Sequence, residues 1–284
     1  MPDRDAGTAR LRRPDQSQDW IVPGFGADRA AHYDAQAAVA LAGVHAMYEL
    51  GACALASQLD GQEAASLLFV GLGTGAELMP YQQLDVPGWR FTGVDPSDAM
   101  LAVARERLAA EGLLARTQLH VGELHSLPPG PPLDGAQMLG VLHHVPETGR
   151  LELLREVKRR LKPGAPLVVG CRVGMDPALW DIELRRWRAH GIPQEELERR
   201  RQALMTMHFI ESDAALFAMF AQAGQRGQQR LDKFVTQFFC RPLFKRTKIE
   251  HQPNNGEMRV VARPHIYRAI KNLHVAQSPV TNVS

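Results

Sequence analysis

Ser66–Glu77 have the sequence SLLFVGLGTGAE, in which an apolar run stops abruptly at three glycines. The run, Leu67–Val70, has the length and the glycine boundary of a buried parallel strand. Glycine tolerates positive φ and lets a ligand come close to the backbone. A strand, a glycine-rich turn and a helix start are the arrangement with which open α/β sheets bind nucleotide-like ligands. The turn consists of Gly71, Leu72, Gly73, Thr74 and Gly75.

A second apolar segment, Trp89–Val94, ends at Asp95 and predicts a second strand. In a doubly wound sheet, an acidic residue about 20 residues past the glycines lies at the tip of the second strand and accepts hydrogen bonds from ribose hydroxyls. The two motifs in this order therefore predict an adenosine-containing ligand.

The segments Phe69–Gly75 (FVGLGTG) and Gly93–Met100 (GVDPSDAM) resemble the first two motifs of class I S-adenosylmethionine-dependent methyltransferases. The G-x-G-x-G spacing differs from the dinucleotide pattern G-x-G-x-x-G, which favours this family over NAD enzymes. The resemblance extends roughly from Tyr33 to Arg241. It implies a doubly wound, Rossmann-like α/β fold with a seven-stranded, mostly parallel sheet and an inserted helical lid. It also implies S-adenosylmethionine as cofactor and transfer of a methyl group to a small-molecule acceptor.

The resemblance carries further positions into the cofactor site. Tyr33 lies in a helical segment that closes over the methionine end in the family, although a half-buried anchor explains it equally well. Met100 either packs on the adenine edge or belongs to the ordinary core. Glu123, one methylene longer than the usual Asp, accepts a bond from the adenine amino group in this comparison. The implied cofactor contacts are Gly71, Leu72, Gly73, Thr74, Gly75, Asp95, Pro96, Met100, Glu123, Leu124, Gly140 and Tyr33.

Two neighbouring histidines follow the predicted fourth strand, Ala136–Leu142. His143 and His144 are candidates for a general base because the carboxyl end of this strand faces the ligand crevice. Packing against the next helix is the simpler explanation, and His208 is a third candidate. No metal is expected, since His120, Glu123 and His125 alternate along a strand end and do not converge as tetrahedral ligands do.

The other elements are predicted from the spacing of apolar residues and from the positions of glycine and proline. Asp28–Leu59 is a helical region, divided at Gly43 and Gly51. A helix over Thr74–Gln83 is short or kinked at Pro80, and its N-terminus faces the methionine carboxylate. The remaining expected elements are a helix over Pro96–Glu111, strands over Thr117–Val121 and Leu167–Cys171, and a helix from Pro146 to Lys162.

From Asp176 onwards the strand–helix alternation breaks. Three consecutive helices are predicted over Asp176–His190, Pro193–Phe209 and Ser212–Ala223, and the last strands over Gln229–Cys240. The domain prediction is a flexible N-terminal segment (1–27), a methyltransferase domain (28–245) with a lid insertion at about 176–223, and a C-terminal extension (246–284) that does not resemble the family.

Composition sets few limits. The chain has 284 residues, a formal net charge of +2 and three cysteines. This near-neutral charge gives no general attraction to nucleic acid or membranes. Scattered cysteines and a polar N-terminus predict a reduced, cytoplasmic protein. The expected partner is a small-molecule substrate. Neither a membrane nor nucleic acid is expected as a partner, and a homodimer is left open.

Position 69 departs from the family pattern. Many members carry an acidic residue two positions before the first glycine, where it binds the methionine amino end or orders the turn, and here that residue is Phe69. Thr74 and Glu77 are candidates to compensate. Two alternatives therefore stand beside the methyltransferase. One is a non-catalytic S-adenosylmethionine-binding protein, and the other is an enzyme like carboxy-S-adenosylmethionine synthase of tRNA modification, for which Arg172 would approach the methyl group.

Overall fold

The computed structural model describes residues 26–174, 177–205 and 209–224 of the chain. The predicted C-terminal extension, the predicted strands over 229–240, His208 and nearly all of the predicted N-terminal segment lie outside the described residues.

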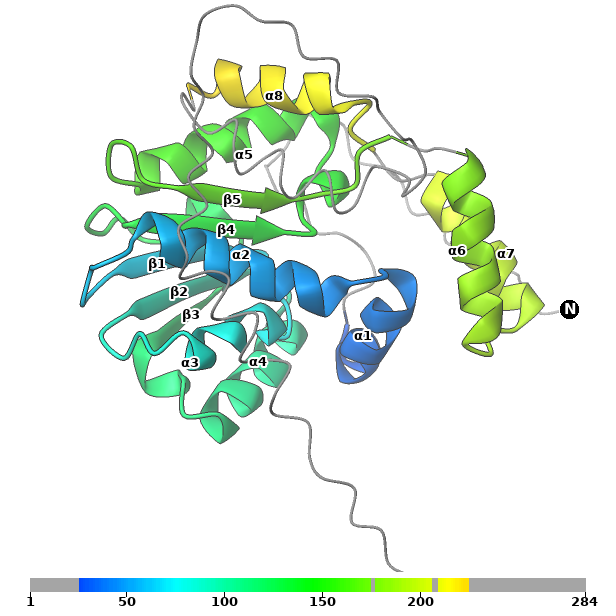
Figure 1. Ribbon diagram of the computed structural model, residues 1–284, viewed down its shortest axis with the longest axis horizontal. Coiled ribbons are helices and arrows are strands. Elements are labelled where there is room, and N and C mark those ends of the chain that lie inside the picture. The colour runs from blue at the N-terminus through cyan, green and yellow to red at the C-terminus, as the bar shows by residue number, and fades with distance from the viewer. Residues whose placement is uncertain (1–25, 175–176, 206–208, 225–284) are drawn as a thin grey trace, which may run out of the picture. The chain divides into compact units, whose positions relative to one another are not determined.

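The described residues form a five-stranded sheet in the order β3-β2-β1-β4-β5, with every pair parallel (Figure 1). The strands are β1 (Ser66–Val70), β2 (Arg90–Asp95), β3 (Thr117–Val121), β4 (Gly135–Leu139) and β5 (Leu167–Gly170). Seven strands were expected, and five are seen in the described ranges; the predicted last strands, over 229–240, lie outside those ranges. The chain order reverses between β1 and β4, and open α/β sheets bind ligands outside the carboxyl ends of their strands at such a point.

Helices cover both faces of this sheet (Figure 1). On one face α2 (Val44–Gln58), α3 (Pro80–Gln83) and α4 (Asp98–Ala110) enclose a core with Leu55, Tyr81 and Leu108. On the other face α5 (Glu147–Arg160) and α8 (Asp213–Gln222) enclose Met138, Leu154 and Phe220. The described helices are completed by α1 (Ala27–Ala40), α6 (Pro177–Ala189) and α7 (Gln194–Met205).

Two serines cap helices as their sequence context suggests. The hydroxyl of Ser97 accepts a hydrogen bond from Met100 N at 3.2 Å at the start of α4, and that of Ser212 accepts one from Ala215 N at 3.1 Å at the start of α8. Such caps satisfy backbone donors that have no partner within the helix.

Of the two glycines expected to divide the N-terminal helical region, only one does so. Gly43, at φ 80°, separates α1 from α2. Gly51 lies inside α2, so the predicted break there is wrong. A Cβ at Gly51 would stand 2.9 Å from Oε1 of Gln137, and close packing of α2 on β4 explains this glycine better than a helix end does.

The helix expected over Thr74–Gln83 is not continuous. A three-residue 3-10 turn, η1 (Ala76–Leu78), precedes the four-residue α3, in which Pro80 occupies the first turn. Proline is tolerated there because the N–H it lacks would have no partner within the helix. The fourth strand also ends earlier than predicted, at Leu139, and a second 3-10 turn, η4 (Leu142–His144), follows it.

The three helices predicted after the fifth strand divide between two places. α8 packs on α5 within the main core, whereas α6 and α7 bury Trp187 and Leu197 against Val39 and Ala40 of α1. The predicted lid over 176–223 stays a prediction, and α8 belongs to the layer that covers the sheet.

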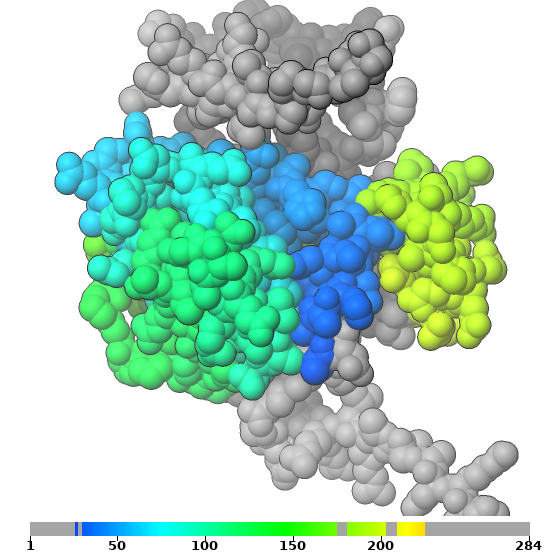
Figure 2. All heavy atoms as spheres, turned by 90° about the horizontal axis from the view of Figure 1, so that it is seen from below, coloured from blue at the N-terminus to red at the C-terminus, as the bar shows by residue number. Residues whose placement is uncertain are grey.

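α1 lies between α4 on one side and α6 on the other (Figure 2). Its last turn contains no basic residue, and its final carbonyls accept hydrogen bonds from distant arginines. Arg186 of α6 donates to the carbonyls of Ala38 and Val39, and Arg172 donates to that of Ala40 at 3.3 Å. These bonds satisfy acceptors that a helix C-terminus leaves open.

No single helix of the described ranges is long and apolar enough to cross a membrane. α1 and α2 reach that length and composition only as a pair, which is bent by 92°.

Candidate functional site

The glycine turn is fixed against the ends of two neighbouring strands. Gly71 N and Leu72 N donate to Val94 O at 2.8 and 3.1 Å, and Gly73 N donates to Oδ2 of Asp95 at 2.9 Å. Gly71 has φ 71°, and a Cβ there would collide with Cγ2 of Val141 at 2.4 Å. Glycine is therefore required at position 71 for both its conformation and its space.

Asp95 ends β2, as predicted, and its carboxylate lies under the turn. It is 9% exposed and accepts bonds from Gly73 N and Ser97 N, each at 2.9 Å. Burial raises the pKa of Asp95, and the two backbone hydrogen bonds oppose that rise. The same side chain thus orders the glycine turn and stands where a ribose is expected.

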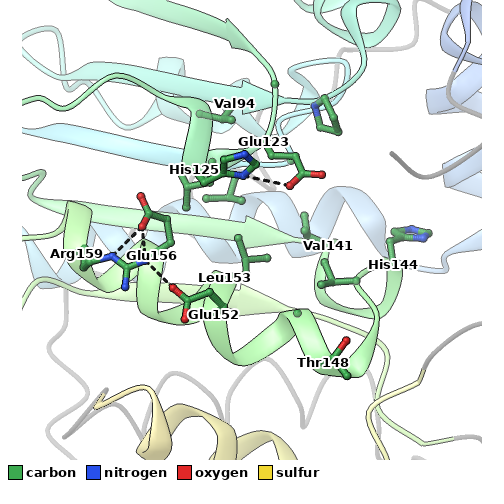
Figure 3. Close-up of a pocket in the computed structure, with 17 residues that line it drawn as sticks. Val94, Glu123, His125, Val141, His144, Thr148, Glu152, Leu153, Glu156 and Arg159 are labelled. Atoms are coloured by element: carbon green, nitrogen blue, oxygen red, sulfur yellow. Dashed lines mark hydrogen bonds and ion pairs between the residues drawn. The ribbon is translucent and has the colours of Figure 1, made fainter. Parts of the chain in front are cut away.

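A cavity of about 290 Å³ opens beside the turn (Figure 3). Val94 and Val141 give it apolar walls, while Nδ1 of His125 pairs with Oε2 of Glu123 at 3.3 Å at its edge. Its size and its mixed lining suit a flat heterocycle with hydrogen-bonding edges. Five predicted site residues line it together: Gly71, Pro96, Glu123, Leu124 and His144.

The opposite wall comes from α5 and was missed in the sequence. Thr148, Glu152 and Glu156 line the cavity from one face of this helix, and Arg159 hydrogen-bonds to Glu152 at 2.8 Å (Figure 3). The spacing of four residues was the available signal, because residues at i and i+4 share a helix face. The apolar stripe of α5 predicts only the side that packs on the sheet and says nothing of this polar face.

The other predicted site residues do not line the cavity, and Met100, Leu72 and Gly140 among them make contacts within the fold. Met100 is buried, and its Cε is 3.3 Å from where a Cβ of Gly73 would stand, so it supports the turn from the core. Leu72 is buried against Gly93. Gly140 donates its N–H to Gly170 O at 2.7 Å.

Thr74 connects the turn to α1 and α4. Its hydroxyl donates to Oδ1 of Asp34 at 2.6 Å, while Arg107 donates to the Thr74 carbonyl at 2.7 Å and pairs with Asp34. Tyr33 precedes Asp34 on α1, and its charge is among the lesser causes that raise the pKa of Tyr48, after burial and Glu77. That a helix N-terminus faces the ligand here stays a prediction, and because η1 and α3 have only three and four residues, they sum few peptide dipoles.

The two histidines have different surroundings. His143 is buried, and its Nδ1 accepts a long hydrogen bond, 3.5 Å, from Arg172 N. Burial lowers the pKa of His143 well below its ordinary value, and the charges of His144, Arg172 and Arg150 add to this. His144 lines the cavity, with its ring centroid 4.3 Å from that of His143.

The buried carboxyl of Glu77 lies on the side of β1 that carries Phe69. The Phe69 ring packs edge-on against Tyr81 and Phe91, with centroids 5.6 and 5.8 Å away. Glu77 in η1 is 3% exposed, and its Oε2 accepts a bond from Nε2 of Gln137 at 2.9 Å. Its Oε1 is buried without a hydrogen-bond partner among the described residues. Burial raises the pKa of Glu77 to about 8 against the opposing bond from Gln137, and the charge of Asp95 contributes to the rise.

Within the described ranges, no three His, Cys, Asp or Glu side chains gather in a way that could hold a metal ion.

The family model described as a methyltransferase domain matches residues 68–167. A curated relative, an uncharacterized 37.1 kDa protein from transposon TN4556 of Streptomyces fradiae, is 34% identical over 113 residues. That match covers 39% of this chain and 31% of the relative, so the chain spans less than a third of the length of the relative.

Several solved structures resemble the chain at low identity. A candidate O-methyltransferase from Nostoc punctiforme has a TM-score of 0.49 at 19% identity, covering 69% of this chain and 53% of its own. Mitomycin 7-O-methyltransferase MmcR has 0.47 at 20%, covering 70% and 54%, and YcgJ from Bacillus subtilis has 0.44 at 21%, covering 62% and 68%. With TM-scores below 0.5, these likenesses support no conclusion about an acceptor.

Proposed function

We propose that the protein is a class I S-adenosylmethionine-dependent methyltransferase that transfers a methyl group to a small-molecule acceptor. The match of residues 68–167 to the methyltransferase-domain model supports this proposal. The observation that carries this proposal is the turn at Gly71–Gly75, tied to the buried Asp95 beside a cavity of about 290 Å³. The near-neutral net charge of +2 favours a small acceptor over nucleic acid.

The residues at this site fit the cofactor. Asp95 retains acceptor capacity for ribose hydroxyls, since each carboxylate oxygen has two lone pairs and accepts one backbone hydrogen bond, from Gly73 N or Ser97 N. Glu123 and Leu124 stand at the cavity where an adenine edge would lie, between the walls of Val94 and Val141. We assign the adenosine half to this cavity.

When bound, S-adenosylmethionine supplies an electrophilic methyl group that leaves its sulfonium sulfur in an in-line displacement. The contribution of this chain is to hold the two reactants in line and to keep water away. α1 closes one side of the site through the bonds among Asp34, Thr74 and Arg107.

A protonated nucleophile would need a base, and we assign that role to His144 rather than His143. Nδ1 of His143 already accepts the N–H of Arg172, so its ring has no acceptor left in the neutral state. His144 lines the cavity and precedes the first turn of α5.

No specific observation favours either alternative, the carboxy-S-adenosylmethionine synthase-like enzyme or the non-catalytic binding protein. Arg172, the candidate for a carboxylated cofactor, contacts Glu183 at 3.6 Å and donates to Ala40 O at 3.3 Å, so other groups already bind its guanidinium. A non-catalytic protein would share the same binding site, and only an assay separates it from an enzyme.

The test is calorimetric titration with S-adenosylhomocysteine, followed by transfer of labelled methyl from S-adenosylmethionine to a panel of small phenols, amines and acids. Asp95→Ala should weaken binding at least about tenfold, as loss of a charge-assisted hydrogen bond does. Asp60→Ala, an exposed acid away from the site, is the matched control. Absence of binding by the wild-type protein would refute the proposal, and binding without transfer would favour the non-catalytic alternative.

A further inference from the structure

Position 69, near the end of β1, carries no carboxylate, but the carboxyl of Glu77 in η1 is buried close to it. Phe69 pairs with Gln137 across β1 and β4, so the two side chains leave the same face of the sheet at the same level. Gln137 donates to Glu77, which follows the last glycine of the turn by two residues. Gln137 therefore holds the carboxyl of Glu77 on the side of β1 that carries position 69.

The Glu77 carboxyl is incompletely satisfied. Oε2 has Gln137, while Oε1 is buried without a hydrogen-bond partner among the described residues. Leaving a buried polar atom unpaired costs free energy, and such atoms commonly mark a site where a ligand or water belongs.

Among the residues that the structure describes, the charged and titratable groups around Glu77 offer it no free cation. Asp95 of β2 is acidic, and Tyr48 of α2 and Tyr81 of α3 have their pKa raised by burial and by the charge of Glu77. Cys53 of α2 also contributes, after burial and Glu77, to the raised pKa of Tyr81. The cation in this neighbourhood is Arg107, which is already bound by Asp34 and Thr74.

We propose that Glu77, held by Gln137, binds the ammonium group of the cofactor's amino-acid end and so supplies the charge that position 69 lacks. This assignment rests on the proposed function, because it requires S-adenosylmethionine in the glycine turn. An ammonium group donates hydrogen bonds and carries positive charge, and Glu77 lacks both a second donor and a cation.

The proposal has a signature that does not depend on activity. The pKa of Glu77 is about 8 without ligand, so the carboxyl is protonated at pH 7. An adjacent ammonium stabilises the carboxylate and lowers this pKa, so binding must release close to one proton at pH 7. Affinity must then fall by about tenfold for each pH unit below 8, until the pKa of the bound state is reached.

The experiment is calorimetry of the full chain with S-adenosylhomocysteine from pH 6 to 8, in buffers of different ionisation enthalpy. A second ligand, 5′-methylthioadenosine, keeps the adenosine and lacks the amino-acid end. Glu77→Gln removes the charge while its amide oxygen can still accept from Gln137, and Glu106→Gln on the exposed face of α4 is the control. Circular dichroism checks that each variant is folded.

The wild type and Glu106→Gln should release a proton with S-adenosylhomocysteine, and Glu77→Gln should not. The variant should bind this ligand at least tenfold more weakly at pH 8, with the difference shrinking toward pH 6. Its affinity for 5′-methylthioadenosine should equal that of the wild type.

If both ligands bind while proton release and affinity are the same in Glu77→Gln, the assignment of Glu77 is overturned and the proposed function stands. If the wild type binds neither ligand, the proposed function fails and the assignment fails with it.

Discussion

Phe69 occupies a position that its surroundings make apolar. Its ring is fully buried, and it packs edge-on against Tyr81 and Phe91. A carboxylate introduced there would lose its hydration and gain no hydrogen-bond donor. Placing the family's acidic residue at position 69 would therefore destabilise the core, whatever its effect on ligand binding.

We expect Phe69→Leu to cost about 1–2 kcal/mol of unfolding free energy and Phe69→Asp more than the about 3–5 kcal/mol typical of Phe→Ala. Urea unfolding followed by circular dichroism measures both. Equal stability of the two variants would contradict the packing described for this ring.

At this scale, Asp95 was predictable because a strand end and its distance from the glycines locate it. Glu77 was only one of two candidates, because its direction depends on η1, whose three residues carry no periodicity. Which of the two histidines is buried and which lines the cavity could not be predicted from the sequence either. It depends on where η4 turns, and Arg150 fixes that turn through bonds to Leu142 O and Val145 O.

Among the elements, α1 is held by polar contacts at its middle and at its C-terminal end. Asp34 joins it to Thr74 and Arg107, and Arg186 joins its last carbonyls to α6. The contact with Thr74 places α1 directly against the glycine turn, so movement of α1 and order in the turn are linked.

We expect a double-mutant cycle of Asp34→Ala and Arg107→Ala to give a coupling free energy of about 1 kcal/mol. The side chains are 32% and 25% exposed, which limits the gain from their charges. Urea unfolding of the four proteins measures it. The matched control is Glu152→Ala with Arg159→Ala, a pair 51% and 57% exposed, for which coupling near zero is expected. Equal coupling in both cycles would contradict the structural role given to Asp34.

Elements with a strong pattern were predicted well. The first three strands and α4 follow from apolar runs and from the Ser97 cap. The break at Gly51 was wrong, because packing of α2 on Gln137 overrides local propensity. The helix after the turn is short, as Pro80 predicted, but it is preceded by a separate 3-10 turn. The place of α8 was not visible either, since its apolar residues fit a lid as well as a core.

For the molecule as a whole, the burial of Glu77 makes stability depend on pH. Its pKa is about 8 in the folded protein and near 4.5 in the unfolded chain. Below pH 4.5 both states are protonated and the group costs nothing. As the pH rises from there to about 8, the unfolded state ionises first and folding loses stability.

We therefore expect Glu77→Gln to be more stable than the ligand-free wild type at pH 8.5, by a few kcal/mol. The difference should shrink toward pH 5. Urea unfolding at both pH values measures it, and every other titrating group is common to the two proteins. Parallel pH profiles would show that Glu77 is not buried as described. Glu77→Gln is thus expected to raise the stability of the ligand-free protein and to lower its affinity for S-adenosylhomocysteine.

The long reach of the contacts that hold α1 has a consequence for synthesis on the ribosome. Arg107 follows Asp34 by 73 residues, and Arg186 follows Val39 by 147. At about 5–20 residues per second, Val39 is synthesised about 7–30 s before Arg186. During that interval the apolar surface of α1 has no partner from α6, and it is available to chaperones and proteases. The order of translation therefore leaves this first helix without its α6 contacts until most of the described fold has been made.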